Sequence, residues 1–327
     1  MKAKVFTELK KNNFSVRNMK IVYMGTPDFA VNPLNALIKN GYEVVGVFTQ
    51  PDKPVGRKAI LTPPPVKVVA ENAGIPVFQP NTLKDGAGVK ILEELNPDIV
   101  VVVAYGKILP SDFLHFPKYG CINIHGSVLP KYRGAAPIQR CVLDGEKFAG
   151  VTSMQMDEGL DTGDMLLVEK TEIGENETSG ELFDRVAVMG ADLLIKTLIA
   201  IENNDIHPVK QDDSQSTYAS MLDKTMCNID WNAPAAVVHN TIRGLDPWPV
   251  ALTNLGGKKL KLFGSSLAGE EGEGKPGEIK LTKNSFSVFC GDGKCVTINE
   301  VQYEGKKRMK ALDFFRGYHL EEGTILQ

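Results

Sequence analysis

Ile99-Val100-Val101-Val102-Val103 is an unbroken apolar run in which every residue is β-branched. A run of this kind is typical of a strand that is buried on both faces, as the inner strands of a parallel sheet are. Strand and helix patterns alternate around it: strands are expected at 21–24, 44–48, 75–78 and 98–105, with helices at 27–40, 66–73 and 88–95 between them. This order predicts an α/β fold with a doubly wound, Rossmann-like parallel sheet.

The first turn between strand and helix reads Gly25-Thr26-Pro27-Asp28-Phe29-Ala30. It lacks the Gly-x-Gly-x-x-Gly spacing that lets a backbone approach a pyrophosphate. A nicotinamide-dependent dehydrogenase is therefore disfavoured, and Pro27 is placed where a helix begins.

Residues 121–125 contain two of the candidate catalytic side chains. From Cys121 to His125 apolar and polar residues alternate, so a strand there would turn Asn123 and His125 to one face. An amide that donates to a developing oxyanion, beside an imidazole, suits attack on a carbonyl. Asp161 follows the strand expected at 150–156 and could hold or charge the imidazole. An ordinary hydrogen-bonded pair in a strand is the alternative interpretation.

These residues resemble the folate-dependent formyltransferases, which move a formyl group from 10-formyltetrahydrofolate to an amine. The resemblance rests on Asn123, His125 and Asp161 and on the stretch 127–138 between them. It implies that the three side chains are catalytic and that the formyl donor is the co-substrate. It also implies a folate-binding element at Ser127, Val128, Leu129 and Pro130, with Val where the family has Leu.

A loop rich in proline, glycine and cations spans 48–67. Loops of this length inside a compact domain are usually functional or disordered. It resembles the loop of those family members whose acceptor is initiator methionyl-tRNA, in which a basic residue wedges at the end of the acceptor stem. Arg57 matches that residue best, and Lys53 and Lys58 are candidates for phosphate contacts. A solvated surface loop is the alternative.

The length of 327 residues suits two domains. We expect a basic N-terminal extension at 1–18, a catalytic domain at 19–206, a polar linker at 207–224 and a smaller OB-like β-barrel at 225–327. Short alternating segments separated by glycines predict the barrel. Its sequences Ile229-Asp230-Trp231 and Pro247-Trp248-Pro249 resemble elements of the tRNA-binding domain of the same family members.

The formal net charge of −3 does not by itself indicate a nucleic-acid partner, so local cationic patches would have to bind phosphate. The five cysteines form no Cys-x-x-Cys pair, and we expect reduced thiols and no metal. No apolar run is long enough to span a membrane. The resemblance implies an enzyme that acts on the folate and initiator methionyl-tRNA, and we expect a cytoplasmic monomer; the alternatives are an amino sugar nucleotide as acceptor, or a protein that only binds nucleic acid.

Overall fold

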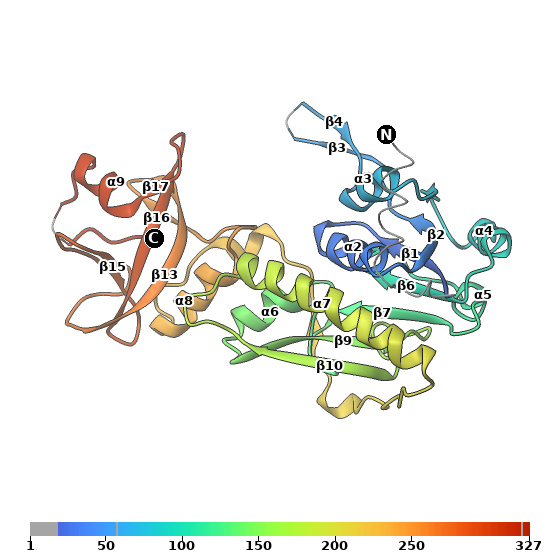
Figure 1. Cartoon of the computed structure of the whole chain (residues 1–327). Helices are drawn as coiled ribbons and strands as arrows, with labels where there is room; N and C mark the ends of the chain where they lie inside the picture. The colour runs from blue at the N-terminus through green and yellow to red at the C-terminus, as the bar shows by residue number, and fades with distance from the viewer. Residues whose placement is uncertain (1–18, 57, 322) are drawn as a thin grey trace. The chain divides into compact units, whose positions relative to one another are not determined.

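The computed structural model describes residues 19–56, 58–321 and 323–327 (Figure 1). The predicted extension at 1–18 and Arg57 lie outside the described residues. Contacts divide the chain into two compact units: the first runs to Arg133 and resumes at 150–169 and 185–216, and the second consists of 134–149, 170–184 and 217–327. The domain boundaries expected after residues 206 and 224 stay a prediction.

A seven-stranded sheet has the strand order β10-β9-β7-β6-β1-β2-β5 (Figure 1). Five of these strands run parallel, and β9 runs antiparallel to β7. The expected Rossmann-like sheet is confirmed, with the addition that it is mixed. The strands are β1 (Lys20–Gly25), β2 (Glu43–Phe48), β5 (Val77–Phe78), β6 (Ile99–Val103), β7 (Cys121–His125), β9 (Phe148–Gln155) and β10 (Met165–Glu172).

The opening apolar run forms β6, which lies between β1 and β7, and all five of its residues are buried. Helices follow the strands, and the helix expected at 27–40 begins as a short 3₁₀ turn before it becomes α2. The helices and turn are η1 (Asp28–Ala30), α2 (Val31–Lys39), α3 (Pro65–Asn72), α4 (Ala87–Leu95), α5 (Ser111–Leu114), α6 (Pro137–Leu143) and α7 (Ser179–Glu202).

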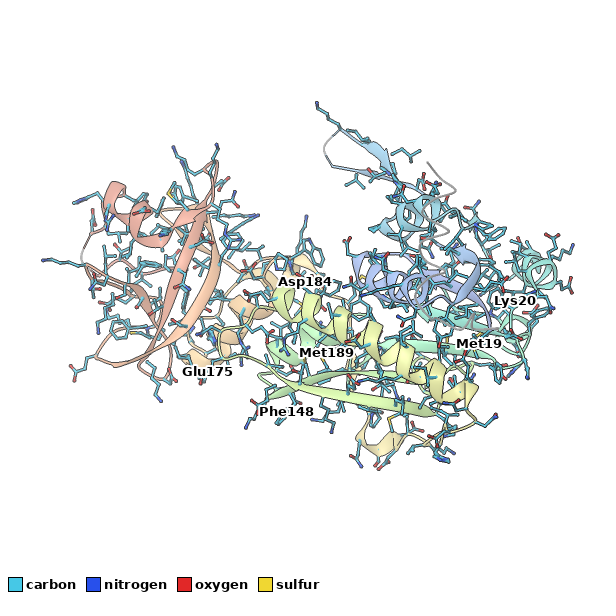
Figure 2. All side chains as sticks on the ribbon, viewed as in Figure 1. Met19, Lys20, Phe148, Glu175, Asp184 and Met189 are labelled. Carbon is cyan, nitrogen blue, oxygen red and sulfur yellow. The ribbon has the colours of Figure 1, made fainter. Side chains whose placement is uncertain are left out.

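Helix α7 is the longest described helix, and it covers the apolar face of β7. A Cβ atom added to Gly190 would lie 3.1 Å from Cγ2 of Ile124, so the missing side chain permits this close approach. Asp184 and Met189 mark the helix in Figure 2. None of the helices in the described ranges combines the length and apolarity needed to cross a bilayer.

The second unit contains an antiparallel sheet with the order β12-β13-β16-β15-β14, and β17 pairs with β16. The sheet curls into a half-barrel, which confirms the expected smaller OB-like second part. Its strands are β12 (Leu252–Leu255), β13 (Lys258–Glu271), β14 (Ile279–Leu281), β15 (Phe286–Phe289), β16 (Lys294–Tyr303) and β17 (Met309–Lys310), accompanied by α8 (Ala235–Gly244) and α9 (Ala311–Gly317).

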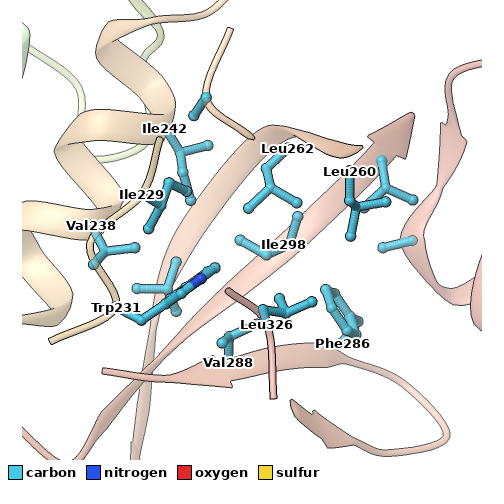
Figure 3. Close-up of a cluster of buried hydrophobic side chains, with 14 of the residues drawn as sticks. Ile229, Trp231, Val238, Ile242, Leu260, Leu262, Phe286, Val288, Ile298 and Leu326 are labelled. Carbon is cyan, nitrogen blue, oxygen red and sulfur yellow. The ribbon is translucent and has the colours of Figure 1, made fainter. Parts of the chain in front are cut away.

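Trp231 lies within the apolar core of this second unit (Figure 3). Its indole Nε1 donates to Oγ1 of Thr253 at 3.0 Å, so the polar end of a buried ring is satisfied. Val238 and Ile242 of α8 belong to the same core. The Trp231 of the sequence motif is therefore a packing residue.

Residues 207–224, for which the sequence predicts a polar linker, form backbone pairings with other parts of the chain. Val209 and Met165 exchange two backbone hydrogen bonds of 2.8 Å, which adds a bridge at the start of β10. Further along are η2 (Asp213–Gln215), β11 (Tyr218–Ala219), which pairs with β8 (Arg133–Gly134), and η3 (Lys224–Cys227). Residues 207–224 are thus held by specific contacts along much of their length.

Candidate active site

Strand β7 presents Asn123 and His125 on one face, as the alternation predicts. Ile122 and Ile124 on the opposite face are fully or almost fully buried, whereas Asn123 is half-buried. The strand is held on both sides: Asn123 is in register with Val102 of β6 and with Met154 of β9. Asn123 and His125 therefore project from a strand that is paired on both sides.

Asp161 reaches this pair from the loop between β9 and β10, which we call the Asp161 loop (residues 156–164). Nδ2 of Asn123 donates to Oδ1 of Asp161 at 3.5 Å, and Nδ1 of His125 lies 3.7 Å from Oδ2. The side chains of His125 and Asp161 are 7% and 11% exposed. The structure thus brings the three predicted residues together in a largely water-excluded cluster, where charge interactions are strengthened.

The other nitrogen of His125 has a fixed partner. Nε2 lies 2.9 Å from the carbonyl oxygen of Tyr132. Because a carbonyl only accepts, Nε2 must carry the hydrogen, and we assign the tautomer from this contact. Nδ1 is therefore the nitrogen that can gain and lose a proton beside Asp161. Sequence reasoning missed Tyr132, since its contribution is a backbone atom that every residue type has.

The predicted folate element, Ser127 to Pro130, forms a tight loop. Oγ of Ser127 donates to the carbonyl of Lys131 at 2.7 Å, and Thr152 donates to the carbonyl of Ser127 at 2.7 Å. Ser127 and Leu129 are buried, while Val128 and Pro130 are half-buried. The first pair therefore shapes the loop, and the second pair offers apolar surface.

The predicted tRNA loop folds into a small hairpin of β3 (Lys53–Val55) and β4 (Ile60–Thr62). Lys53 and Lys58 are exposed on it, and Arg57 falls outside the described residues. Burial, and then the charge of Lys53, lowers the pKa of Lys107. The hairpin also exposes more than half of the side chains of Val55, Ile60 and Leu61. Cations and apolar groups are therefore presented together.

The base of the hairpin is anchored at Asp52. Nζ of Lys67 donates to both of its carboxylate oxygens at 2.9 Å, and Nε2 of Gln79 donates to Oδ1 at 2.8 Å. These bonds, that of Gln79 first, lower the pKa of the Asp52 carboxyl. Asp52 therefore remains charged at neutral pH and fixes the point at which the hairpin leaves the sheet.

The cysteines and acidic residues offer no metal site in the described ranges, where no three His, Cys, Asp or Glu side chains come together. All five cysteines are buried and reduced. Burial raises the pKa of Cys121, whose side chain lies on the same strand as Asn123, to about 12. Its thiol is therefore protonated and unreactive at neutral pH.

Trp248 and the basic residues of the second unit lie at its surface. Trp248 is 54% exposed, in contrast to the buried Trp231. Lys258, Lys259 and Lys261 are exposed at the beginning of β13. Arg308 stacks its guanidinium 4.0 Å above the ring of Phe263 and bonds Glu300, so that cation is held in place.

Comparison with known proteins extends over both units. Residues 19–198 match the formyl transferase family, and residues 221–319 match the formyl transferase C-terminal domain. Methionyl-tRNA formyltransferase of Lachnospira eligens is 51% identical over 314 residues, which are 94% of this chain and 99% of that protein. Methionyl-tRNA formyltransferase of Bacillus velezensis is 46% identical over 308 residues, 94% and 97% of the two chains.

Solved structures share the fold at lower identity. An N-formyltransferase from Helicobacter canadensis in complex with folinic acid and dTDP-3-aminofucose aligns with a TM-score of 0.68 at 24% identity over 87% of this chain and 99% of that chain. HypX from Aquifex aeolicus in complex with tetrahydrofolic acid aligns at 0.62 and 17%, over 91% and 47%. The resemblance inferred from Asn123, His125 and Asp161 is confirmed: the chain is a transferase that belongs to the formyl transferase family.

Proposed function

We propose that the protein transfers the formyl group of 10-formyltetrahydrofolate to the α-amino group of initiator methionyl-tRNA, for translation initiation. The observation that carries this proposal is the identity of 46–51% with methionyl-tRNA formyltransferases over 94% of the chain. The region of sequence identity includes the seven-stranded sheet, which carries the Asn123 cluster, and also the half-barrel of the second unit. We expect a cytoplasmic monomer, as for an enzyme that acts on a single charged tRNA.

In the proposed reaction the methionyl amine attacks the formyl carbon. A carbon–nitrogen bond forms there, the bond from that carbon to N10 of the folate breaks, and the formyl oxygen is negatively charged in between. Asn123 has two amide hydrogens, of which one is directed at Asp161. The second donates to the developing oxyanion.

His125 transfers protons through Nδ1, because its Nε2–H donates to the carbonyl of Tyr132. Nδ1–H of the charged ring stabilises the oxyanion and passes its proton to N10, and the freed Nδ1 then accepts the proton that the attacking amine loses. The imidazole thus ends the cycle in the state in which it began. The Asp161 carboxylate, 3.7 Å from Nδ1, stabilises the charged ring.

The folate is proposed to lie against the loop from Ser127 to Pro130. Half-buried Val128 and Pro130 would flank a flat heteroaromatic ring, while buried Ser127 and Leu129 keep the loop in shape. A Cβ atom on Gly150 would lie 2.7 Å from Cγ2 of Val128, so a glycine is needed beneath this loop. The loop adjoins β7, which carries His125 at its end.

Replacing Asp161 with asparagine tests its assigned role. Asp161→Asn keeps the size of the side chain and removes its charge, so we expect kcat to fall by about tenfold to a hundredfold and the pH profile of kcat to change. Asp164→Asn, an exposed position in the same loop, is the matched control and should leave both unchanged. An unaltered pH profile in Asp161→Asn would remove Asp161 from the proton chemistry.

Three cations of the 48–67 loop are proposed to contact the tRNA: Arg57, Lys53 and Lys58. For Arg57→Ala we expect kcat/KM with initiator methionyl-tRNA to fall by about tenfold, with the KM for the folate unchanged, and a shallower dependence on salt because one phosphate contact is lost. Lys90→Ala, an exposed cation on α4, is the control. Equal effects of the two substitutions would contradict a specific role of the hairpin.

The acceptor is tested directly by supplying 10-formyltetrahydrofolate with initiator methionyl-tRNA, elongator methionyl-tRNA or amino sugar nucleotides and measuring formyl transfer to each. Transfer confined to the initiator tRNA is the expected result. Transfer to a sugar nucleotide alone would show that the acceptor is an amino sugar and not the tRNA. Transfer to none of them would favour a protein that only binds nucleic acid.

A further inference from the structure

We propose that Gln211 is a positioning residue that holds the Asp161 loop in its reactive geometry, with Arg133 fixing the orientation of Gln211. The kinetic part of this proposal rests on the function proposed above. Gln211 lies between the two segments matched by the family comparisons, which end at 198 and resume at 221. Its side chain is nevertheless buried, with 6% of the residue exposed in a polar stretch of sequence.

The amide of Gln211 makes every hydrogen bond that it can donate. Nε2 donates to the carbonyl of Asp161 at 2.9 Å and to the carbonyl of Gly163 at 2.7 Å. Oε1 accepts from Nε and Nη2 of Arg133 at 3.0 and 2.8 Å. A flipped amide would set its N–H group against the guanidinium and its oxygen against two carbonyls, so only one orientation is possible.

The loop needs this support because its backbone is unusual. Asp161 has a φ of +54°, in the left-handed region that residues other than glycine adopt uncommonly, although aspartate does so more often than most. At Gly163 a Cβ atom would lie only 1.7 Å from the carbonyl oxygen of Gln155. Asp157 closes the other end by accepting from Thr162 Oγ1 at 2.7 Å. Gln211 holds the backbone of Asp161 through its carbonyl oxygen.

We call the hydrogen bonds from Gln211 to the carbonyls of Asp161 and Gly163 the Gln211 clamp. Arg133 connects this clamp to His125. The preceding residue, Tyr132, supplies the carbonyl that fixes His125. Arg133 is 11% exposed at its side chain and also bonds Asp213 at 2.7 Å, whose side chain is 78% exposed. Two consecutive residues therefore hold His125 directly and Asp161 through Gln211, which sets the relative position of imidazole and carboxylate.

The first test is Gln211→Glu in the full chain. The carboxylate still accepts from Arg133, but it has no hydrogen for the carbonyls of Asp161 and Gly163. We expect kcat to fall by about tenfold to a hundredfold, as small misplacements of reacting groups do, with the KM for initiator methionyl-tRNA within about twofold of wild type. Gln215→Glu makes the same chemical change at an exposed position of the same segment and should leave kcat unchanged. A Gln211→Glu enzyme with wild-type kcat would overturn the proposal.

The second test asks whether Gln211 acts through Asp161. In the double variant Gln211→Glu/Asp161→Asn, kcat should match that of Asp161→Asn alone, because a positioned carboxylate is no longer present. Losses that multiply would instead assign Gln211 a general structural role and overturn the proposal.

The third test needs no acceptor. Hydrogen exchange of the peptide covering 156–164 should be faster in Gln211→Glu than in wild type and unchanged in Gln215→Glu. Unchanged exchange in Gln211→Glu would overturn the clamp. If wild type formylates no acceptor while the exchange results are as expected, the proposed function fails and the clamp stands.

Discussion

Asn123→Ala is expected to lower kcat for formyl transfer by about a hundredfold to a thousandfold, which is the usual loss when one oxyanion donor is removed. The expectation follows from the position of the amide: Asn123 is half-buried on β7, with one hydrogen directed at Asp161 and the other available to substrate. Since the interaction strengthens as the oxyanion develops, KM should change much less than kcat. Single-turnover formyl transfer with saturating tRNA measures this directly.

The matched control is Asn72→Ala at the exposed end of α3, where alanine favours the helix. It should keep wild-type kcat and thermal stability. Asn123→Ala should also keep the cooperative unfolding transition of wild type, because the strand is held by β6 and β9 through backbone bonds. An Asn123→Ala enzyme within about threefold of wild-type kcat would exclude Asn123 as the oxyanion donor.

His125→Gln should lower kcat by about a hundredfold to ten-thousandfold, the range that general acid–base groups supply. Glutamine is chosen because its amide can still donate to the carbonyl of Tyr132, which keeps the loop in place, but it cannot gain a second proton beside Asp161. The expected loss therefore reports proton transfer and charge rather than the structural bond. The pH dependence of kcat should flatten in the same variant.

His115→Gln provides the comparison, since His115 is exposed at the end of α5 and does not belong to the cluster of Asn123, His125 and Asp161. It should leave both kcat and its pH profile unchanged. If His125→Gln keeps the wild-type pH profile, the protons are handled by another group and the mechanism assigned to Nδ1 is wrong.

The sequence predicts the location of the β7 cluster well because the signal there is local. A strand has a period of two, so the order of residues alone places Asn123 and His125 on one face. The unbroken run 99–103 likewise identifies the strand that is buried on both faces, and it forms β6. The family resemblance identifies Asp161 as a candidate catalytic residue. The loop that carries it follows β9, as expected from the strand predicted at 150–156.

The features that were missed depend on contacts between distant parts of the chain. Strand β9 is buried along most of its length, as an inner parallel strand is, so nothing local in its sequence signals that it runs antiparallel to β7. Gln211 lies in a polar, aperiodic stretch whose sequence predicts a linker, and its partner Asp161 is 50 residues away. Nothing nearby in sequence distinguishes this buried glutamine from an exposed one.

The two edges of the seven-stranded sheet bear on self-association. Exposed strand edges present unpaired backbone groups to which another chain can add, which is a route to aggregation. At one edge β5 has only two residues, and at the other β10 is covered at its start by Val209. The outer part of β10 carries Glu169, which pairs with Lys196, and then Lys170 and Glu172. We expect these short or charged edges to discourage edge-to-edge pairing between copies of the protein.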